Sequence, residues 1–171
     1  PMEMLGWLTN DLSSAIASCK KINKIYRQKP SIQEPEHPVL LEPVRGEVSF
    51  DHVSFSRGSQ EILKDISFTL PEGKTLGIMG ATGAGKTSMV NLMMRFFDAS
   101  SGSVRLDGTD VKELSLKQLR GSIGTVMQDV FLFSDTISEN IKMGQRETLG
   151  SPVMVHAAEI AQAKGFIEEM P

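Results

Sequence analysis

One short stretch near the middle of the chain constrains the fold more than any other, because its glycines and its neighbours demand one local shape. Residues 80–87 read Gly-Ala-Thr-Gly-Ala-Gly-Lys-Thr and match the pattern G-x-x-x-x-G-K-[ST]. The short apolar run 76–79 precedes them, and apolar residues at helical spacing follow over 89–97. This order predicts a buried parallel strand, a tight loop and a helix, the central unit of an α/β protein.

The residue types in this loop favour the binding of phosphate. Gly83 and Gly85 can take positive φ and let the backbone approach an anion without a clash from a Cβ atom. The N–H groups of such a loop form an anion nest, to which the following helix adds the positive end of its dipole. Lys86 supplies a cation for the β- and γ-phosphates and Thr87 a hydroxyl for Mg²⁺, whereas Ser88 is either a phosphate donor or an ordinary first-turn residue. The predicted phosphate contacts are Gly80, Thr82, Gly83, Ala84, Gly85, Lys86, Thr87 and Ser88.

The N-terminal part of the chain differs from the rest in pattern and in charge. Residues 2–27 lack proline and carry an apolar stripe at spacings of three and four, which predicts one long amphipathic helix. Residues 28–46 contain four prolines and predict an extended linker. Five basic and two acidic side chains lie in residues 1–29, which suits either a solvated helix end or a helix that leaves a membrane on its cytoplasmic side. Residues 30–171 hold 13 basic and 19 acidic side chains, so nucleic-acid binding is not expected.

Beyond the linker, the pattern predicts short strands joined by tight turns. Residues 48–55 alternate with a slip at Asp51-His52, which indicates a bulge. Residues 66–70 form a second strand, and residues 104–106 lead into an Asp107-Gly108 hairpin turn. Further expected elements are a short helix over 114–121, a strand over 123–127, and helices over 137–142 and 152–169.

Gln128 is the second polar residue that the pattern singles out. It is expected at the carboxyl end of a strand, where doubly wound sheets bind ligands, although a glutamine in a solvated loop is the commoner case. The apolar run 130–133 follows it closely and is either core or a surface for a partner.

Taken in order, these segments resemble the nucleotide-binding domain of an ABC transporter of the exporter type. The resemblance implies an α/β fold, namely a P-loop NTPase that is here an incomplete ABC-type domain with an antiparallel β subdomain, preceded by a long N-terminal helix. It divides the chain into the end of the last transmembrane or intracellular helix (1–28), a linker (29–46) and the N-terminal part of the nucleotide-binding domain (47–171). The residues that carry it are Val53-Ser54-Phe55, Ile62 to Phe68, Gly80 to Ser88, Ser101-Gly102, Asp107-Gly108, Val126 to Asp129, Phe133, and Ile137 to Ile141.

The resemblance also implies a function and a set of roles. It implies that ATP and Mg²⁺ bind here, and that ATP binding and hydrolysis drive transport across a cell membrane, with this part on the cytoplasmic side. Lys86 and Gln128 would act in catalysis, and Thr87 and Gln128 would hold Mg²⁺. Arg57 stands where the family has an aromatic residue that stacks on adenine, and a guanidinium plane can also stack on a base. Ile62 would border the same nucleotide. Phe55 is the alternative for the stacking role, although strand alternation favours a place for it in the core.

The implied partners are a second nucleotide-binding domain, identical or different, and the coupling helices of a transmembrane domain, which would meet residues 130–141. The family's signature motif (Leu-Ser-Gly-Gly-Gln), catalytic Glu and switch His do not occur in these 171 residues, and His156 does not match the switch His by order. We therefore expect a piece of a longer polypeptide that binds nucleotide but hydrolyses it poorly by itself. Two alternatives stay open: a soluble P-loop ATPase or kinase, and a non-catalytic nucleotide-binding interaction module.

Overall fold

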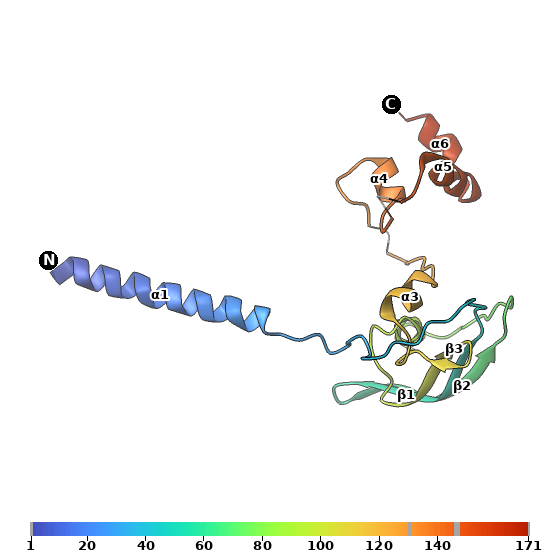
Figure 1. Ribbon diagram of the computed structural model, residues 1–171, viewed down its shortest axis with the longest axis horizontal. Coiled ribbons are helices and arrows are strands. Elements are labelled where there is room, and N and C mark those ends of the chain that lie inside the picture. The colour runs from blue at the N-terminus through green and yellow to red at the C-terminus, as the bar shows by residue number, and fades with distance from the viewer. Residues whose placement is uncertain (1, 130, 146–147, 171) are drawn as a thin grey trace. The chain divides into compact units, whose positions relative to one another are not determined.

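The computed structural model describes residues 2–129, 131–145 and 148–170 (Figure 1). The chain divides into two compact units, Pro1–Gly124 and Thr125–Pro171, and each is described here by itself. The elements of the first unit are α1 (Met2–Tyr26), β1 (Val48–Arg57), β2 (Gln60–Leu70), α2 (Lys86–Met93), β3 (Ser101–Leu106), β4 (Thr109–Asp110) and α3 (Leu116–Gly121). Those of the second unit are α4 (Ile137–Ile141), α5 (Ser151–Ile160) and α6 (Lys164–Glu168).

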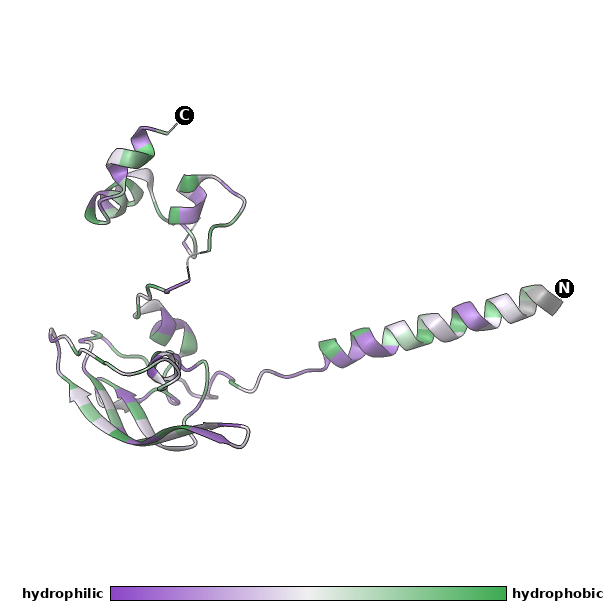
Figure 2. Ribbon diagram, turned by 180° about the vertical axis from the view of Figure 1, so that it is seen from behind, coloured by the Kyte–Doolittle hydropathy of each residue, from purple (hydrophilic) through white to green (hydrophobic). Residues whose placement is uncertain are grey.

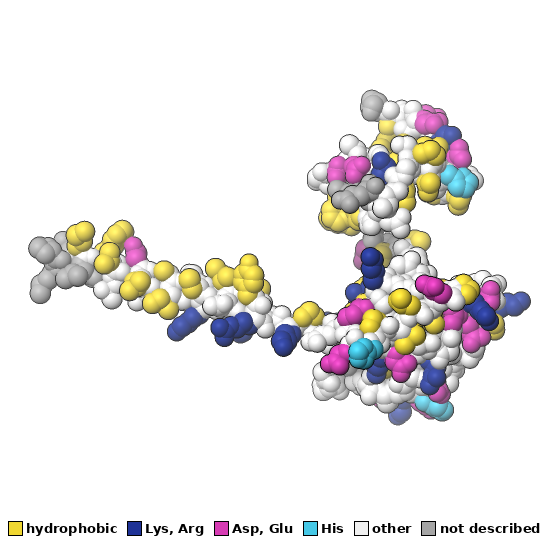
Figure 3. Space-filling model, viewed as in Figure 1, with side chains coloured by type: hydrophobic (Ala, Val, Ile, Leu, Met, Phe, Trp, Pro, Cys, Tyr) yellow, Lys and Arg dark blue, Asp and Glu magenta, His cyan; other side chains and the backbone are white. Residues whose placement is uncertain are grey.

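Helix α1 confirms the long helix predicted at the start of the chain. The residues of α1 whose side chains are described are exposed, and polar and apolar residues alternate along it (Figure 2). Lysine and arginine side chains gather toward its C-terminal end (Figure 3), where the helix dipole favours cations. Among the described helices, none combines the length and the apolar character needed to cross a membrane.

The first unit is built on an antiparallel sheet with the strand order β2-β1-β3-β4. Phe50 pairs with Phe68 and Val53 with Ile66, and the register shifts between these two pairs. His52 lies inside the shift with φ 48°, so the predicted bulge is confirmed. The predicted hairpin between β3 and β4 is also confirmed, because both residues of its Asp107-Gly108 turn take positive φ.

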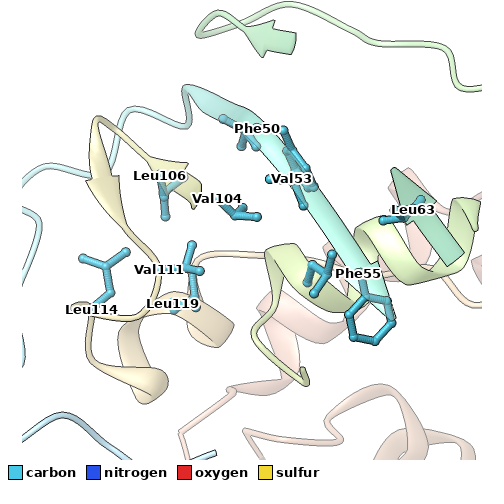
Figure 4. Close-up of a cluster of buried hydrophobic side chains, with 11 residues drawn as sticks. Phe50, Val53, Phe55, Leu63, Val104, Leu106, Val111, Leu114 and Leu119 are labelled. Atoms are coloured by element: carbon cyan, nitrogen blue, oxygen red, sulfur yellow. The ribbon is translucent and has the colours of Figure 1, made fainter. Parts of the chain in front are cut away.

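The core of this unit lies on the face of the sheet that packs against α2 and α3 (Figure 4). Phe55 is 5% exposed, as its place in the alternation predicts. Phe50 stacks on Phe68 with the ring centroids 4.7 Å apart. The buried apolar residues are Val48, Phe50, Val53, Phe55, Leu63, Leu92, Val104, Leu106, Val111, Leu114 and Leu119.

The strands predicted over 76–79 and 123–127 are wrong, because neither segment is a strand in the structure. Leu76 and Ile78 are each 42% exposed, and Val126 is fully exposed. A parallel strand needs hydrogen-bonded neighbours and cover on both faces. Neither segment pairs with another strand among the described residues of its own unit.

Two predicted helices end earlier than their apolar patterns. Helix α2 ends at Met93 and not at residue 97, because Arg95 takes the left-handed conformation with φ 51° and the chain turns there. The helix predicted over 152–169 divides into α5 and α6, and Gln162 between them has φ 58°. The short helices α3 and α4 occur where they were expected.

The second half of the segment 28–46 is extended and forms hydrogen bonds with other parts of the first unit. The Gln118 amide accepts a hydrogen bond from Leu41 N at 2.9 Å and donates one to Leu41 O at 2.7 Å. The Asp107 carboxylate accepts the backbone N–H groups of residues 45–47 at 2.7 to 2.9 Å. The segment therefore enters β1 at a defined point.

Candidate functional site

The loop that precedes α2 has the backbone that its sequence predicts. Gly83 and Gly85 have φ of 83° and 87°, in the left-handed region that glycine enters without cost from a Cβ atom. Ala84 N donates to Ala81 O at 3.2 Å and closes a turn inside the loop. Gly80, Thr82, Gly83 and Ala84 are exposed, so their backbone groups can be reached by a ligand.

Gly85 lies against β2, and both the packing and the backbone conformation at this position require a glycine. It is buried, and a Cβ atom there would lie 2.6 Å from Leu63 Cδ2 and 3.2 Å from Ile62 O. Real Cβ atoms essentially never come as close as the first of these distances. The half-buried Ile62, expected beside a nucleotide, therefore lies directly against the last glycine of the loop.

The N-terminus of α2 is open toward the loop. Gly85 is the N-cap residue, no side chain caps the helix, and its first turn contains no acidic residue. The first N–H groups of a helix have no partner within the helix and carry the positive end of its dipole. An anion is the natural partner for such a terminus.

Lys86 lies across the start of the loop. Its Nζ donates to Gly80 O at 2.7 Å and to Ala81 O at 2.8 Å. An ammonium group has three N–H donors, so two hold the loop together and one is left for a further acceptor. Thr87 is exposed and Ser88 is half-buried on the first turn of α2, so both hydroxyls begin the helix beside the loop.

These features fit a nucleoside triphosphate. The left-handed glycines, the uncapped helix terminus and the lysine supply N–H donors and one positive charge, and they place no carboxylate in the first helical turn. The hydroxyl of Thr87 is an oxygen ligand of the type that Mg²⁺ prefers. The described residues contain no group of three or more His, Cys, Asp or Glu that could hold a metal, and Mg²⁺ at phosphates needs only one or two protein ligands.

Arg57 ends β1 and is exposed, and its guanidinium lies over an aromatic ring. Its Cζ lies 5.4 Å from the centroid of the Phe97 ring. Phe97 in turn contacts Phe55, with the ring centroids 5.6 Å apart. The sequence predicts Phe97 only as part of a helical apolar pattern, and no signal in the sequence links it to Arg57.

Gln128 belongs to the second unit, whereas the loop and Thr87 belong to the first. The structure places Gln128 in an exposed bend and not at the end of a strand, which corrects the prediction for its local structure. Its side chain offers an amide oxygen, which is a suitable ligand for Mg²⁺.

The apolar segment after Gln128 is held in a fixed loop by one side chain. Asn140 Oδ1 accepts a hydrogen bond from Phe133 N at 2.8 Å, and Asn140 Nδ2 donates to Phe133 O at 3.1 Å and to Thr136 O at 2.9 Å. Phe131 and Leu132 are nevertheless 74% and 73% exposed. Leu132 and Phe133 line a cavity of about 530 Å³, and most of its other lining residues are apolar. Val130, which begins the predicted partner segment, lies outside the described residues.

His156 lies on the surface of the second unit, away from any predicted role in catalysis. It is exposed, and its Nδ1 is 3.8 Å from Glu159 Oε2. The same carboxylate is 2.6 Å from Lys164 Nζ, and the hydrogen bond and charge of that lysine lower the pKa of Glu159. His156 therefore lies beside a surface carboxylate that Lys164 already pairs with.

Comparison with known proteins gives one consistent result. A family model described as ABC transporter matches residues 63–170. The chain is 38% identical over 171 residues to an uncharacterized ABC transporter ATP-binding protein, YknV, of Bacillus subtilis, and covers 28% of it. It is 35% identical over 171 residues to an ATP-dependent lipid A-core flippase of Desulfotalea psychrophila, and covers 30% of it.

A solved structure agrees with these matches. It is that of a bacterial Atm1-family ABC exporter with ATP bound, to which the chain is 31% identical with a TM-score of 0.86. All of this chain and 30% of that exporter are covered. The chain thus spans less than a third of the length of each of these relatives.

Proposed function

Because the chain belongs to the ABC transporter family, we propose that it forms the ATP-binding portion of an exporter, in which ATP binding and hydrolysis drive transport across a membrane. Domains of this family bind ATP, and its members hydrolyse it. The observation that carries the proposal is the geometry of the loop before α2. Two left-handed glycines, an uncapped helix terminus and Lys86 meet within a few residues there.

The geometry and charge of the loop support the roles proposed for its own residues, and the resemblance to the family supports the role proposed for Gln128. The backbone of the segment 80–85 holds the phosphates, and Lys86 provides the charge that the β- and γ-phosphates require. Thr87 holds Mg²⁺ through its hydroxyl, and Ser88 donates to a phosphate. By its resemblance to the family, Gln128 is proposed to supply an oxygen ligand to Mg²⁺ and to orient the attacking water. Bound ATP supplies the phosphoryl group, and these side chains bind and orient it.

The division of the chain into parts is also a proposal. Residues 1–28 form the end of a helix that continues from a transmembrane domain, residues 29–46 form a linker, and residues 47–171 form the first part of the nucleotide-binding domain. The basic residues near the end of α1 support the cytoplasmic side of a membrane for this region, because positive charge collects there. The match to membrane exporters over the whole chain supports the same location.

Two partners are proposed. A second nucleotide-binding domain completes the ATP site in exporters of this kind, and the coupling helices of a transmembrane domain meet the segment 130–141. The support for the second partner is the exposed pair Phe131 and Leu132, of which Leu132 lines an apolar cavity, in a loop that Asn140 holds through its hydrogen bonds to Phe133. Contiguous exposed apolar surface is typical of interaction sites.

The decisive experiment is replacement of the loop lysine in the natural protein. We expect Lys86→Ala to weaken ATP binding at least tenfold and to abolish ATP hydrolysis, because the cation for the phosphates is lost. Lys117→Ala is the matched control, since Lys117 is an exposed lysine on α3 of the same unit. Binding is measured by titration calorimetry with Mg²⁺ and hydrolysis by phosphate release. Unchanged affinity in Lys86→Ala would refute the assignment of the phosphate loop. ATP binding without hydrolysis by the natural protein would favour the non-catalytic alternative.

A further inference from the structure

Arg120 on α3 supplies the positive charge that the end of α2 lacks in its own sequence. The last turn of α2 contains no basic residue, and the last carbonyl groups of a helix have no partner within it. Arg120 Nε donates to Met94 O at 3.2 Å, and its Nη2 donates to Arg95 O at 2.9 Å. The guanidinium also lies over the Phe96 ring, with Cζ 5.0 Å from the ring centroid. A side chain of α3 therefore binds the carbonyl groups at the C-terminal end of α2.

Helix α2 is short and is held at both ends by residues outside it. Only Leu92 among its eight residues is buried, and two methionines pack at the edge of the core. At the N-terminal end, Gly85 lies close against Leu63 of β2. At the C-terminal end, Arg120 bonds to the backbone. The two ends are about 12 Å apart at 1.5 Å per residue, so loss of the Arg120 contact would leave the direction of α2 less well fixed.

Helix α3 is itself fixed by the core and by the linker. Leu119 is 1% exposed and belongs to the core cluster (Figure 4). Gln118 exchanges two hydrogen bonds with the backbone of Leu41. Leu116 N donates to the Glu34 carboxylate, at 3.1 Å from Oε2. Side-chain hydrogen bonds on α3 therefore connect the linker with the end of α2.

The direction of α2 matters because of the side chains on its first turn. Lys86, Thr87 and Ser88 begin this helix, and they are the side chains proposed to bind the phosphates and Mg²⁺. Catalysis of phosphoryl transfer consists almost entirely of positioning and electrostatic stabilisation. A displacement of about 1 Å caused far from the reacting atoms can lower a rate by about 10².

We propose that Arg120 is a positioning residue for ATP hydrolysis, which acts through α2 on the first helical turn after the phosphate loop, and that Gln118 connects this support to the linker. Arg120 lies at the opposite end of α2 from the phosphates and does not contact them. The inference rests on the proposed function, because it requires a triphosphate in the loop and a reaction to position.

The test measures Mg²⁺-dependent ATP hydrolysis and ATP binding by the full-length natural protein and its variants. Arg120→Ala removes both hydrogen bonds to the end of α2, so we expect kcat to fall about tenfold or more. The dissociation constant for ATP should rise no more than about threefold, because the loop and Lys86 lie at the other end of the helix. Arg120→Lys keeps the charge but lacks the planar fork that bonds two carbonyl groups, so kcat should fall about fivefold.

Arg105→Ala is the matched control. Arg105 is an exposed arginine of the same unit, and its side chain donates to Ser103 and to Gly108 O, within β3 and its turn. Its kcat should stay within about twofold of the natural value. All rates are measured at a temperature at which circular dichroism shows each variant folded, because a merely structural role would lower the midpoint of thermal unfolding and leave kcat unchanged.

The variant Gln118→Leu tests the connection to the linker. It should lower kcat about threefold by itself, and it should lower kcat no further in the Arg120→Ala background, because both side chains act through α3. If the two effects multiply, the role of Gln118 is wrong.

The other outcomes separate this inference from the proposed function. If folded Arg120→Ala hydrolyses ATP at the natural rate, or if Arg120→Lys is fully active, the positioning role is wrong while the phosphate loop stands. If Arg120→Ala does not fold, Arg120→Lys decides by the same criterion. A natural protein that binds ATP without hydrolysing it overturns the positioning role and leaves the binding site intact. If Lys86→Ala leaves ATP binding unchanged, the proposed function itself fails.

Discussion

Replacement of Gly85 by alanine tests whether the phosphate loop is held in shape by its contact with β2. Gly85 has φ 87°, and a left-handed conformation costs an alanine about 1–2 kcal/mol. The added Cβ would also lie 2.6 Å from Leu63 Cδ2. Leu63 is 4% exposed, so its methyl group can move only into packed core, and such overpacking costs about 1–3 kcal/mol. We therefore expect Gly85→Ala to lower the free energy of unfolding by about 2–5 kcal/mol.

Gly83 provides the matched control, because it has almost the same φ and no packing partner. Its φ is 83°, and a Cβ atom there would meet nothing within 4 Å. Gly83→Ala should therefore cost only the conformational part, about 1–2 kcal/mol. Urea unfolding of both variants, at equal slope, measures the difference of about 1–3 kcal/mol that comes from the clash.

A second replacement identifies the clashing partner. Leu63→Ala removes the methyl group that the new Cβ would meet, so Gly85→Ala should cost at least 1 kcal/mol less in the Leu63→Ala background than in the natural protein. The contact is refuted if Gly83→Ala and Gly85→Ala destabilise equally. It is also refuted if the two replacements at Leu63 and Gly85 are additive.

Three further predictions concern the edges of the first unit. Asp107→Ala leaves three backbone N–H groups of the segment before β1 without their acceptor, so stability should fall by about 2–4 kcal/mol and limited proteolysis should cut that segment faster. Gln118→Leu removes both hydrogen bonds to Leu41 at similar volume and should cost about 1–3 kcal/mol in urea unfolding, a loss that Gln118→Glu would only partly share. The hydrogen bond and charge of Asp65, 2.6 Å away, and then the charge of Asp51 raise the pKa of His52 above its usual value. The folded protein therefore binds this proton more tightly than the unfolded chain does. The resulting stabilisation is complete below about pH 6.5 and is lost as the pH rises through the pKa of the folded state. The variant His52→Gln should abolish this pH dependence of the free energy of unfolding.

The features that the sequence predicts correctly are those that neighbouring residues determine. The bulge at Asp51-His52 and the Asp107-Gly108 turn follow from a break in alternation and from turn chemistry. The left-handed conformations of Gly83 and Gly85 follow from the loop pattern itself. Each of these signals lies within a few residues of the structure that it specifies.

The predictions that fail are those that need partners distant in sequence. The apolar runs 76–79 and 123–127 have the composition of buried strands, but a strand forms only when another strand pairs with it. The end of α2 is missed for a related reason, because the apolar residues Phe96 and Phe97 continue the helical pattern after the backbone has turned at Arg95. Phe97 then contacts β1 through Phe55 and Arg57, and no local pattern indicates that contact.

The early end of α2 has a consequence for the proposed nucleotide site. A helix that continued to residue 97 would place Phe97 according to helical geometry, whereas the turn at Arg95 carries it to the end of β1. The turn is itself held by charge: Arg95 is 7% exposed, its Nε donates to Asp98 Oδ1 at 3.1 Å, and Arg120 donates to Arg95 O at 2.9 Å. The left-handed Arg95 costs conformational energy, and these hydrogen bonds offset that cost. One of the apolar residues that extended the predicted helix, Phe97, is therefore the ring that lies beside Arg57, and the hydrogen bonds around Arg95 stabilise the turn that places it there.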